Sequence, residues 1–172
     1  WRCHQAACAA QAGDPDRAIT LLEALAAELA QRPGDQRLEL ARVHQFLGTF
    51  YGTRLRPGDL ARSEEMTRKA LAVQQELLPP DNPETTSSLG NLGNLLAQQG
   101  RFDEAGELAA QVLQHDLAHY GPEHVQVASS KVILAASLYQ RGMAAKAEPL
   151  LLEAVATHRK QPGNPMDLAF AL

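Results

Sequence analysis

Glycines recur along this chain at a fixed interval. Gly58, Gly100 and Gly142 superimpose when the sequence is shifted by 42 residues, and so do Leu71, Leu113 and Val155. A chain with such an internal period folds as a row of similar units, each of which packs on its neighbours. The sequence therefore predicts a tandem array.

Each unit of the period has the pattern of two helices joined by a tight turn. In the clearest unit, Asn82 and Pro83 form a helix start signal, since Asn can cap a helix and Pro suits its first turn. An apolar stripe with helical spacing follows, then Gly100 as the turn, and then a second stripe. The first stripe consists of Leu89, Leu92, Leu95 and Leu96, and the second of Phe102, Ala105, Leu108, Val112 and Leu113.

The same pattern divides the whole chain into one array of about four helix pairs. Asp14 and Pro15 give a start signal in the first unit, and Asn164 with Pro165 announces a fifth unit. The predicted repeats are approximately 1–36, 37–81, 82–123 and 124–163, with the start of a fifth at 164–172.

Composition and charge exclude several kinds of partner. The formal net charge is -4 and 45% of the residues are apolar, so the chain lacks the basic surface that binds nucleic acid or anionic lipid. No apolar run reaches the roughly 18 residues of a membrane span. Cys3 and Cys8 are badly spaced for a disulfide scaffold, which favours a reducing compartment. We therefore expect a cytoplasmic protein that binds neither nucleic acid nor membrane.

These residues resemble a known repeat family. Leu47, Gly48 and Tyr51, followed by a small residue on the second helix, resemble the tetratricopeptide repeat, and the 42-residue period with PPDNP and YGPEH linkers resembles its kinesin light chain subtype. The resemblance implies an all-α fold, a right-handed superhelical α-solenoid of antiparallel helix-turn-helix repeats. It also implies that the first helices line the concave side. Ser63 departs from the pattern, where Ala105 and Ala147 stand, and Pro149 falls inside a second helix.

The candidate binding residues are those predicted to face this concave groove. An Asn amide can donate to and accept from a peptide backbone without reading its side chains, so we expect a protein or peptide ligand there. The alternative is that the two asparagines are simply solvated. Arg42 is the one cation predicted in the groove, and the lysines of carboxylate-clamp repeats are missing. The predicted partner-binding set is Arg42, Gln45, Thr49, Asn91, Asn94, Gln98, Ser129 and Tyr139.

The sequence contains no convincing catalytic, cofactor or metal motif. His115 and His119 lie one helical turn apart beside Asp116 and could hold a metal, but a solvated helix end explains them as well. The glycines of LGNLGNL lack the strand and the Gly-Lys-Ser/Thr ending of a phosphate loop. No catalytic residue, metal ligand or cofactor is therefore predicted.

Two functional classes remain. The first is a non-catalytic scaffold that holds a peptide or partner protein in its concave groove. The second is an accessory, regulatory or oligomerisation segment of a larger signalling enzyme, because similar Ala-rich and Arg-biased repeats accompany bacterial serine/threonine kinases and ATPases. End-to-end self-association through Trp1, Met166, Leu168, Phe170 and Leu172 is a further possibility.

Overall fold

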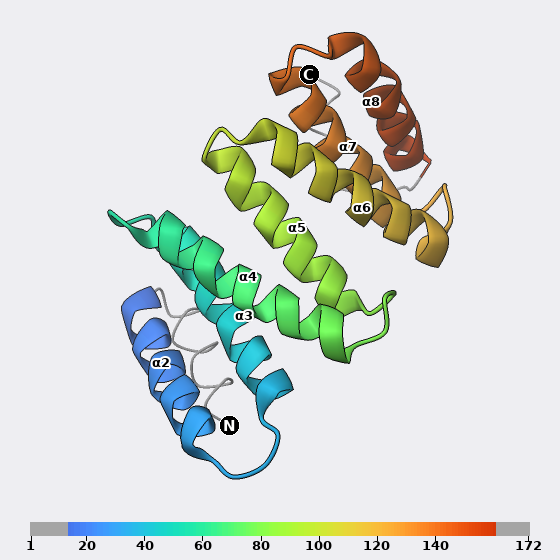
Figure 1. The fold of residues 1–172 in the computed structure, drawn as a ribbon. Coiled ribbons are helices and arrows are strands. Elements are labelled where there is room, and N and C mark those ends of the chain that lie inside the picture. The colour runs from blue at the N-terminus through green and yellow to red at the C-terminus, as the bar shows by residue number, and fades with distance from the viewer. Residues whose placement is uncertain (1–13, 161–172) are drawn as a thin grey trace. The chain divides into compact units, whose positions relative to one another are not determined.

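The fold consists of consecutive helices (Figure 1). A computed structural model describes residues 14–160 of the chain, and within that range it contains seven helices and no strand. The helices are α2 (Pro15–Gln31), α3 (Arg37–Arg54), α4 (Asp59–Leu77), α5 (Pro83–Gln98), α6 (Phe102–Tyr120), α7 (Val125–Gln140) and α8 (Ala144–Arg159).

The predicted start and turn signals are confirmed within the described residues. Asp14 caps α2, since its Oδ1 accepts from the Arg17 amide at 2.9 Å, and the Asn82 Oδ1 accepts from the Glu84 amide at 2.8 Å. Gly100 and Gly142 have φ angles of 77° and 75°, in the left-handed region that side chains other than glycine rarely adopt. The expected fifth repeat at 164–172 lies outside the described residues.

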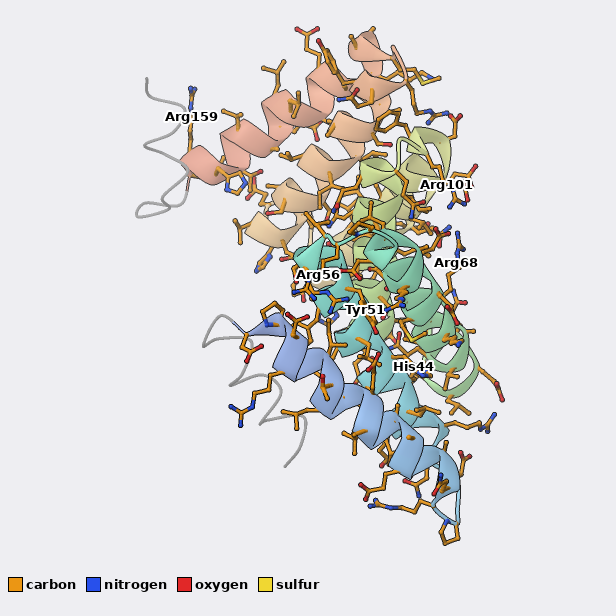
Figure 2. All side chains as sticks on the ribbon, turned by 90° about the vertical axis from the view of Figure 1, so that its left-hand side faces the viewer. His44, Tyr51, Arg56, Arg68, Arg101 and Arg159 are labelled. Atoms are coloured by element: carbon orange, nitrogen blue, oxygen red, sulfur yellow. The ribbon has the colours of Figure 1, made fainter. Side chains whose placement is uncertain are left out.

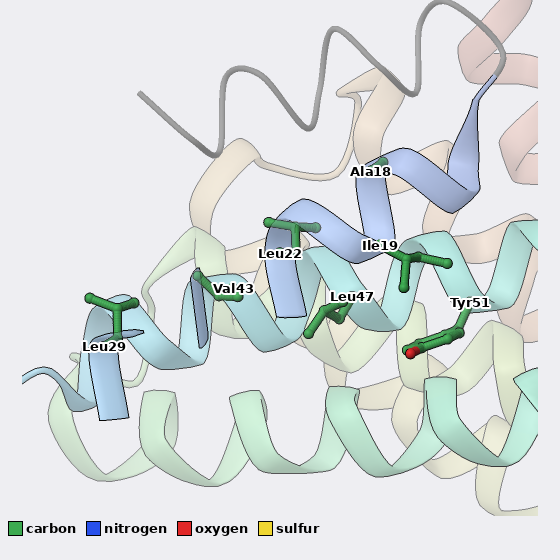
Figure 3. Packing of buried hydrophobic residues seen from close by; sticks show 7 residues of the cluster. All are labelled: Ala18, Ile19, Leu22, Leu29, Val43, Leu47 and Tyr51. Atoms are coloured by element: carbon green, nitrogen blue, oxygen red, sulfur yellow. The ribbon is translucent and has the colours of Figure 1, made fainter. Parts of the chain in front are cut away.

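The described residues form two compact units, one ending at Leu95 and the other beginning at Leu96. The first unit contains α2, α3, α4 and most of α5. Its core lies between α2 and α3, where Leu22 and Val43 are each 1% exposed (Figure 3). The cluster consists of Ala18, Ile19, Leu22, Leu29, Val43, Leu47 and Tyr51.

The second unit is built from α6, α7 and α8. Ser137 on α7 donates to the Phe102 carbonyl at 2.8 Å, and the Arg141 Nε lies 2.6 Å from the Asp103 carboxylate. Both contacts hold α7 against the first turn of α6. Helix α8 continues through Pro149.

Small side chains occupy the contact positions on the second helices. Ser63, Ala105 and Ala147 are all buried. The Ser63 hydroxyl donates to the Gly48 carbonyl at 2.7 Å, so this buried polar group has a partner on the facing helix. Serine is therefore compatible with a position that the other repeats fill with alanine.

Candidate functional site: the face of α3 and α5

Two first helices of the array, α3 and α5, are joined by side-chain bonds in the first unit. The Arg42 guanidinium donates to the Glu84 carboxylate, from Nε at 3.0 Å and from Nη2 at 2.9 Å. One turn further along, the Gln45 amide donates to the Ser87 hydroxyl at 3.3 Å. Both pairs join residues 42 positions apart, so equivalent positions of two successive repeats lie side by side.

The Arg42–Glu84 ion pair alters the expected electrostatics of this face. Hydrogen bonding to Glu84 raises the pKa of Arg42, which therefore stays charged and bound to its neighbour. We expected Arg42 to be the one cation of the groove, and its charge is matched within the protein by Glu84. This face consequently presents no net positive charge from Arg42 to an incoming carboxylate.

The exposed amides of this face belong to α5. Asn91 and Asn94 lie on the solvent side of the helix, and within residues 14–160 neither side chain has a hydrogen-bond partner. Thr49 on α3 is also exposed, but its hydroxyl donates to the Gln45 carbonyl of its own helix at 3.1 Å. Among the predicted site residues of the first unit, Asn91 and Asn94 are therefore the ones without a hydrogen-bond partner in residues 14–160.

The other three predicted residues belong to the second unit. Gln98 is exposed at the end of α5, and Ser129 is half-buried, with its hydroxyl bonded to the Val125 carbonyl at 3.1 Å. Tyr139 is 65% exposed and lines an apolar groove shared with α8. Their assignment to the binding face stays a prediction.

A second concavity of the first unit lies between α2, α3 and α4. It has a volume of about 380 Å³, and Tyr51 and His44 of α3 line it (Figure 2). The Tyr51 hydroxyl donates to the Glu23 carboxylate, and the Arg62 guanidinium lies 5.6 Å from the centre of the Tyr51 ring. This concavity was not predicted from the sequence, because its residues come from three helices without a shared spacing.

Burial determines the protonation states of Tyr51 and His44, two side chains that line this concavity. It is the main reason that the pKa of Tyr51 is raised, with the hydrogen bond to Glu23 second. Burial likewise lowers the pKa of His44, helped by the positive charge of Lys69. Both side chains are therefore neutral at pH 7. With two carboxylates and two cations nearby, the site is a balanced polar contact between helices.

The histidines near the end of α6 form stacked rings. The ring centres of His115 and His119 lie 6.0 Å apart, and those of Tyr120 and His124 lie 4.6 Å apart. Over residues 14–160, no group of three or more His, Cys, Asp or Glu side chains is arranged to hold a metal ion. Asp116, the third candidate ligand, is buried and accepts a hydrogen bond from Ser130 at 2.5 Å.

None of the helices between residues 14 and 160 is both long enough and apolar enough to cross a bilayer.

Comparison with known families decides the identity of the repeat. A family model described as tetratricopeptide repeat matches residues 52–118 and 84–160, which together span more than half of the chain. The chain belongs to the tetratricopeptide repeat family. The tetratricopeptide repeat is generally a non-catalytic fold that serves protein–protein interaction. The comparison with curated proteins produced no match.

Solved structures agree with this family. The first is a structure of nearly identical TPR-like repeats from a kinesin light chain of Podosopora anserina. It is 24% identical to this chain, with a TM-score of 0.82 over 98% of this chain and 79% of that one. BtubC (BKLC) from P. vanneervenii is 20% identical, with a TM-score of 0.80 over 95% of this chain and 64% of that one. MamA of MSR-1 is 22% identical, with a TM-score of 0.65 over 92% and 76% of the two chains.

These matches confirm the predicted fold class. The chain is an all-α tetratricopeptide repeat array, and its structural relatives include proteins of the kinesin light chain type.

Proposed function

We propose that this tetratricopeptide repeat array is a non-catalytic scaffold that holds an extended peptide of a partner protein on the face formed by α3 and α5. The observation that carries the proposal is the pair of side-chain bonds that join these helices through residues 42 positions apart. Asn91 and Asn94 follow Glu84 and Ser87 along the same side of α5, are exposed and have no partner in residues 14–160.

The chemistry of this face favours recognition of a peptide backbone. Each asparagine amide offers two donors and an acceptor, which match the C=O and N–H groups of an extended chain. Arg42 is already bonded to Glu84, so a ligand does not need a carboxylate to bind here. The preferred ligand is therefore a peptide whose contacting residues are small or uncharged.

Replacing Asn91 and Asn94 together with alanine is expected to weaken peptide binding about tenfold. Each neutral hydrogen bond contributes roughly 0.5–1.5 kcal/mol, so the loss of two lowers affinity by about that factor. Peptides selected from a random library on the full-length chain serve as probes, and calorimetry gives their dissociation constants. Helicity and the melting temperature should stay unchanged, because both side chains are exposed.

A matched control uses two exposed amides on a second helix. Gln111 and Gln114 of α6 have the same three-residue spacing as Asn91 and Asn94, and their double alanine variant should bind the selected peptides normally. Equal weakening of peptide binding in both double variants would show that the loss does not depend on the face formed by α3 and α5. Unchanged binding in the asparagine variant would place the peptide elsewhere on the protein.

We also propose that the chain works in the cytoplasm, because the spacing of Cys3 and Cys8 favours a reducing compartment.

A further inference from the structure

A short row of hydrogen bonds runs from the interior of the first unit to the exposed side of α5. The Gln74 side chain of α4 is fully buried, and its Nε2 donates to the Gln45 Oε1 at 3.2 Å. The Gln45 Nε2 donates in turn to the hydroxyl oxygen of Ser87 at 3.3 Å, and Ser87 is exposed. Gln45 therefore connects a buried amide to an exposed hydroxyl.

Ser87 lies on the same side of α5 as the two asparagines of the proposed peptide site. It precedes Asn91 by four residues and Asn94 by seven, which are one and two turns of a helix. The Ser87 oxygen accepts from Gln45, but within residues 14–160 its own hydrogen has no acceptor. This hydrogen is therefore available to a ligand that reaches the asparagines.

The equivalent serine of the next repeat is bonded differently. Ser129 follows Ser87 by 42 positions, and its hydroxyl donates to the Val125 carbonyl of its own helix at 3.1 Å. Ser87 makes no such bond to the Pro83 carbonyl, four residues before it. The free hydrogen thus distinguishes Ser87 from its counterpart and goes with the bond from Gln45.

The equivalent pair of the second unit supports the orientation of the Gln74 amide. Asp116 and Ser130 follow Gln74 and Ser88 by 42 positions, and the Ser130 hydroxyl donates to the Asp116 carboxylate, which only accepts. In the first unit the Gln74 Oε1 and the Ser88 hydroxyl are buried without a partner in residues 14–160. An oxygen of Gln74 turned towards Ser88 matches the second unit and leaves the nitrogen for Gln45.

We propose that Ser87 is a further residue of the peptide site, that it donates its hydroxyl hydrogen to a backbone carbonyl of the ligand, and that Gln74 fixes this polarity through Gln45. Each member of the row donates to the next. A Gln45 amide turned the other way would accept from Ser87 and use up its hydrogen. The inference rests on the proposed peptide site, and it adds that the ligand must offer an acceptor beside Asn91.

The variant S87A tests the contact with the ligand. It should weaken binding of the peptides selected on the full-length chain about fivefold, the effect of losing one neutral hydrogen bond. S87T keeps the hydroxyl and should bind these peptides normally. Calorimetry measures both dissociation constants.

The asparagine variant separates failure of this inference from failure of the proposed function. Normal binding by S87A, beside weakened binding when Asn91 and Asn94 are both alanine, would overturn the role of Ser87 and leave the proposed function standing. Normal binding by both variants would place the peptide elsewhere and overturn both proposals.

The variant Q74E tests the control of polarity. A carboxylate accepts but does not donate, so the Gln45 amide should turn its nitrogen inward and accept from Ser87. Asp116 is buried at the equivalent position, so a carboxylate is compatible with this contact. Q74E should therefore weaken peptide binding about as much as S87A does, and adding S87A to it should cost no further affinity. A second fivefold loss in the double variant would overturn the role of Gln74.

The variant Q74L gives the same test without a buried charge. It removes the donor to Gln45, so that the Gln45 amide can take both orientations and Ser87 keeps its free hydrogen for part of the time. The effect of S87A should then fall from about fivefold to about twofold. An undiminished effect of S87A in the Q74L background would contradict the proposed control by Gln74.

Discussion

The substitution Asp59→Asn is expected to lower the free energy of unfolding by about 3 kcal/mol, the low end of the cost of breaking a buried ion pair. The Asp59 side chain is 2% exposed, and both of its oxygens accept from Arg54, at 2.7 and 2.8 Å. Arg54 also donates to Asp16 of α2 at 2.7 Å. The cluster therefore ties α2, α3 and the start of α4 together, and an asparagine leaves Arg54 without its buried counter-charge.

Urea denaturation at pH 7 measures this effect. Asp35→Asn is the matched control, because Asp35 also bonds an arginine, Arg37, but is exposed. The control should leave the unfolding free energy nearly unchanged, since exposed ion pairs contribute little. Similar losses in both variants would show that burial of Asp59 does not strengthen its pairing.

The same carboxylate has a defined effect on acid stability. Hydrogen bonds from Arg54 lower the pKa of Asp59 from 3.8 to about 2, so the folded state binds this proton less readily than the unfolded state. Stability from the charged Asp59 is complete above about pH 4 and is lost as the pH falls towards 2. The difference in unfolding free energy between wild type and Asp59→Asn should therefore shrink over that interval. A difference that stays constant with pH would mean that the charge of Asp59 does not contribute to the unfolding free energy.

The sequence was sufficient to predict helix starts and turns, because their signals are local and periodic. Asp14 and Asn82 cap helices, and Gly100 and Gly142 adopt left-handed turns, as their positions predicted. Apolar spacing likewise predicted the buried stripe of Leu92, Leu95 and Leu96. Each of these signals depends on residues within one or two turns of one another.

Contacts between helices were harder to predict. The pairing of Arg42 with Glu84 could have been found by aligning the repeats, since a charge and its opposite occupy equivalent positions. The bonds of Arg54 to Asp59 and Asp16 have no such signal, because the partners are 5 and 38 positions away. The apolar groove beside Leu152 was also missed, because its stripe looks like any core-facing stripe in the sequence.

The substitution Gly48→Ala is expected to destabilise the protein by about 1–3 kcal/mol, although alanine favours helices more than glycine does. A Cβ at this position would overlap the Thr67 hydroxyl and lie 3.3 Å from the Ser63 carbonyl oxygen. Thr67 and Ser63 are buried, and Ser63 is bonded to the Gly48 carbonyl, so α4 cannot move aside without losing that bond. Overpacking should therefore outweigh the gain in helix propensity.

Gly90→Ala on α5 is the matched control, because nothing lies within 4 Å of a Cβ built there. It gains the helix propensity without a clash, so the unfolding free energy should rise by up to about 1 kcal/mol. Thermal and urea unfolding of both variants measure the two changes. Opposite signs are expected because close approach of α3 and α4 makes glycine necessary at position 48, whereas position 90 is open. A stabilised Gly48→Ala protein would show that these helices can separate at little cost.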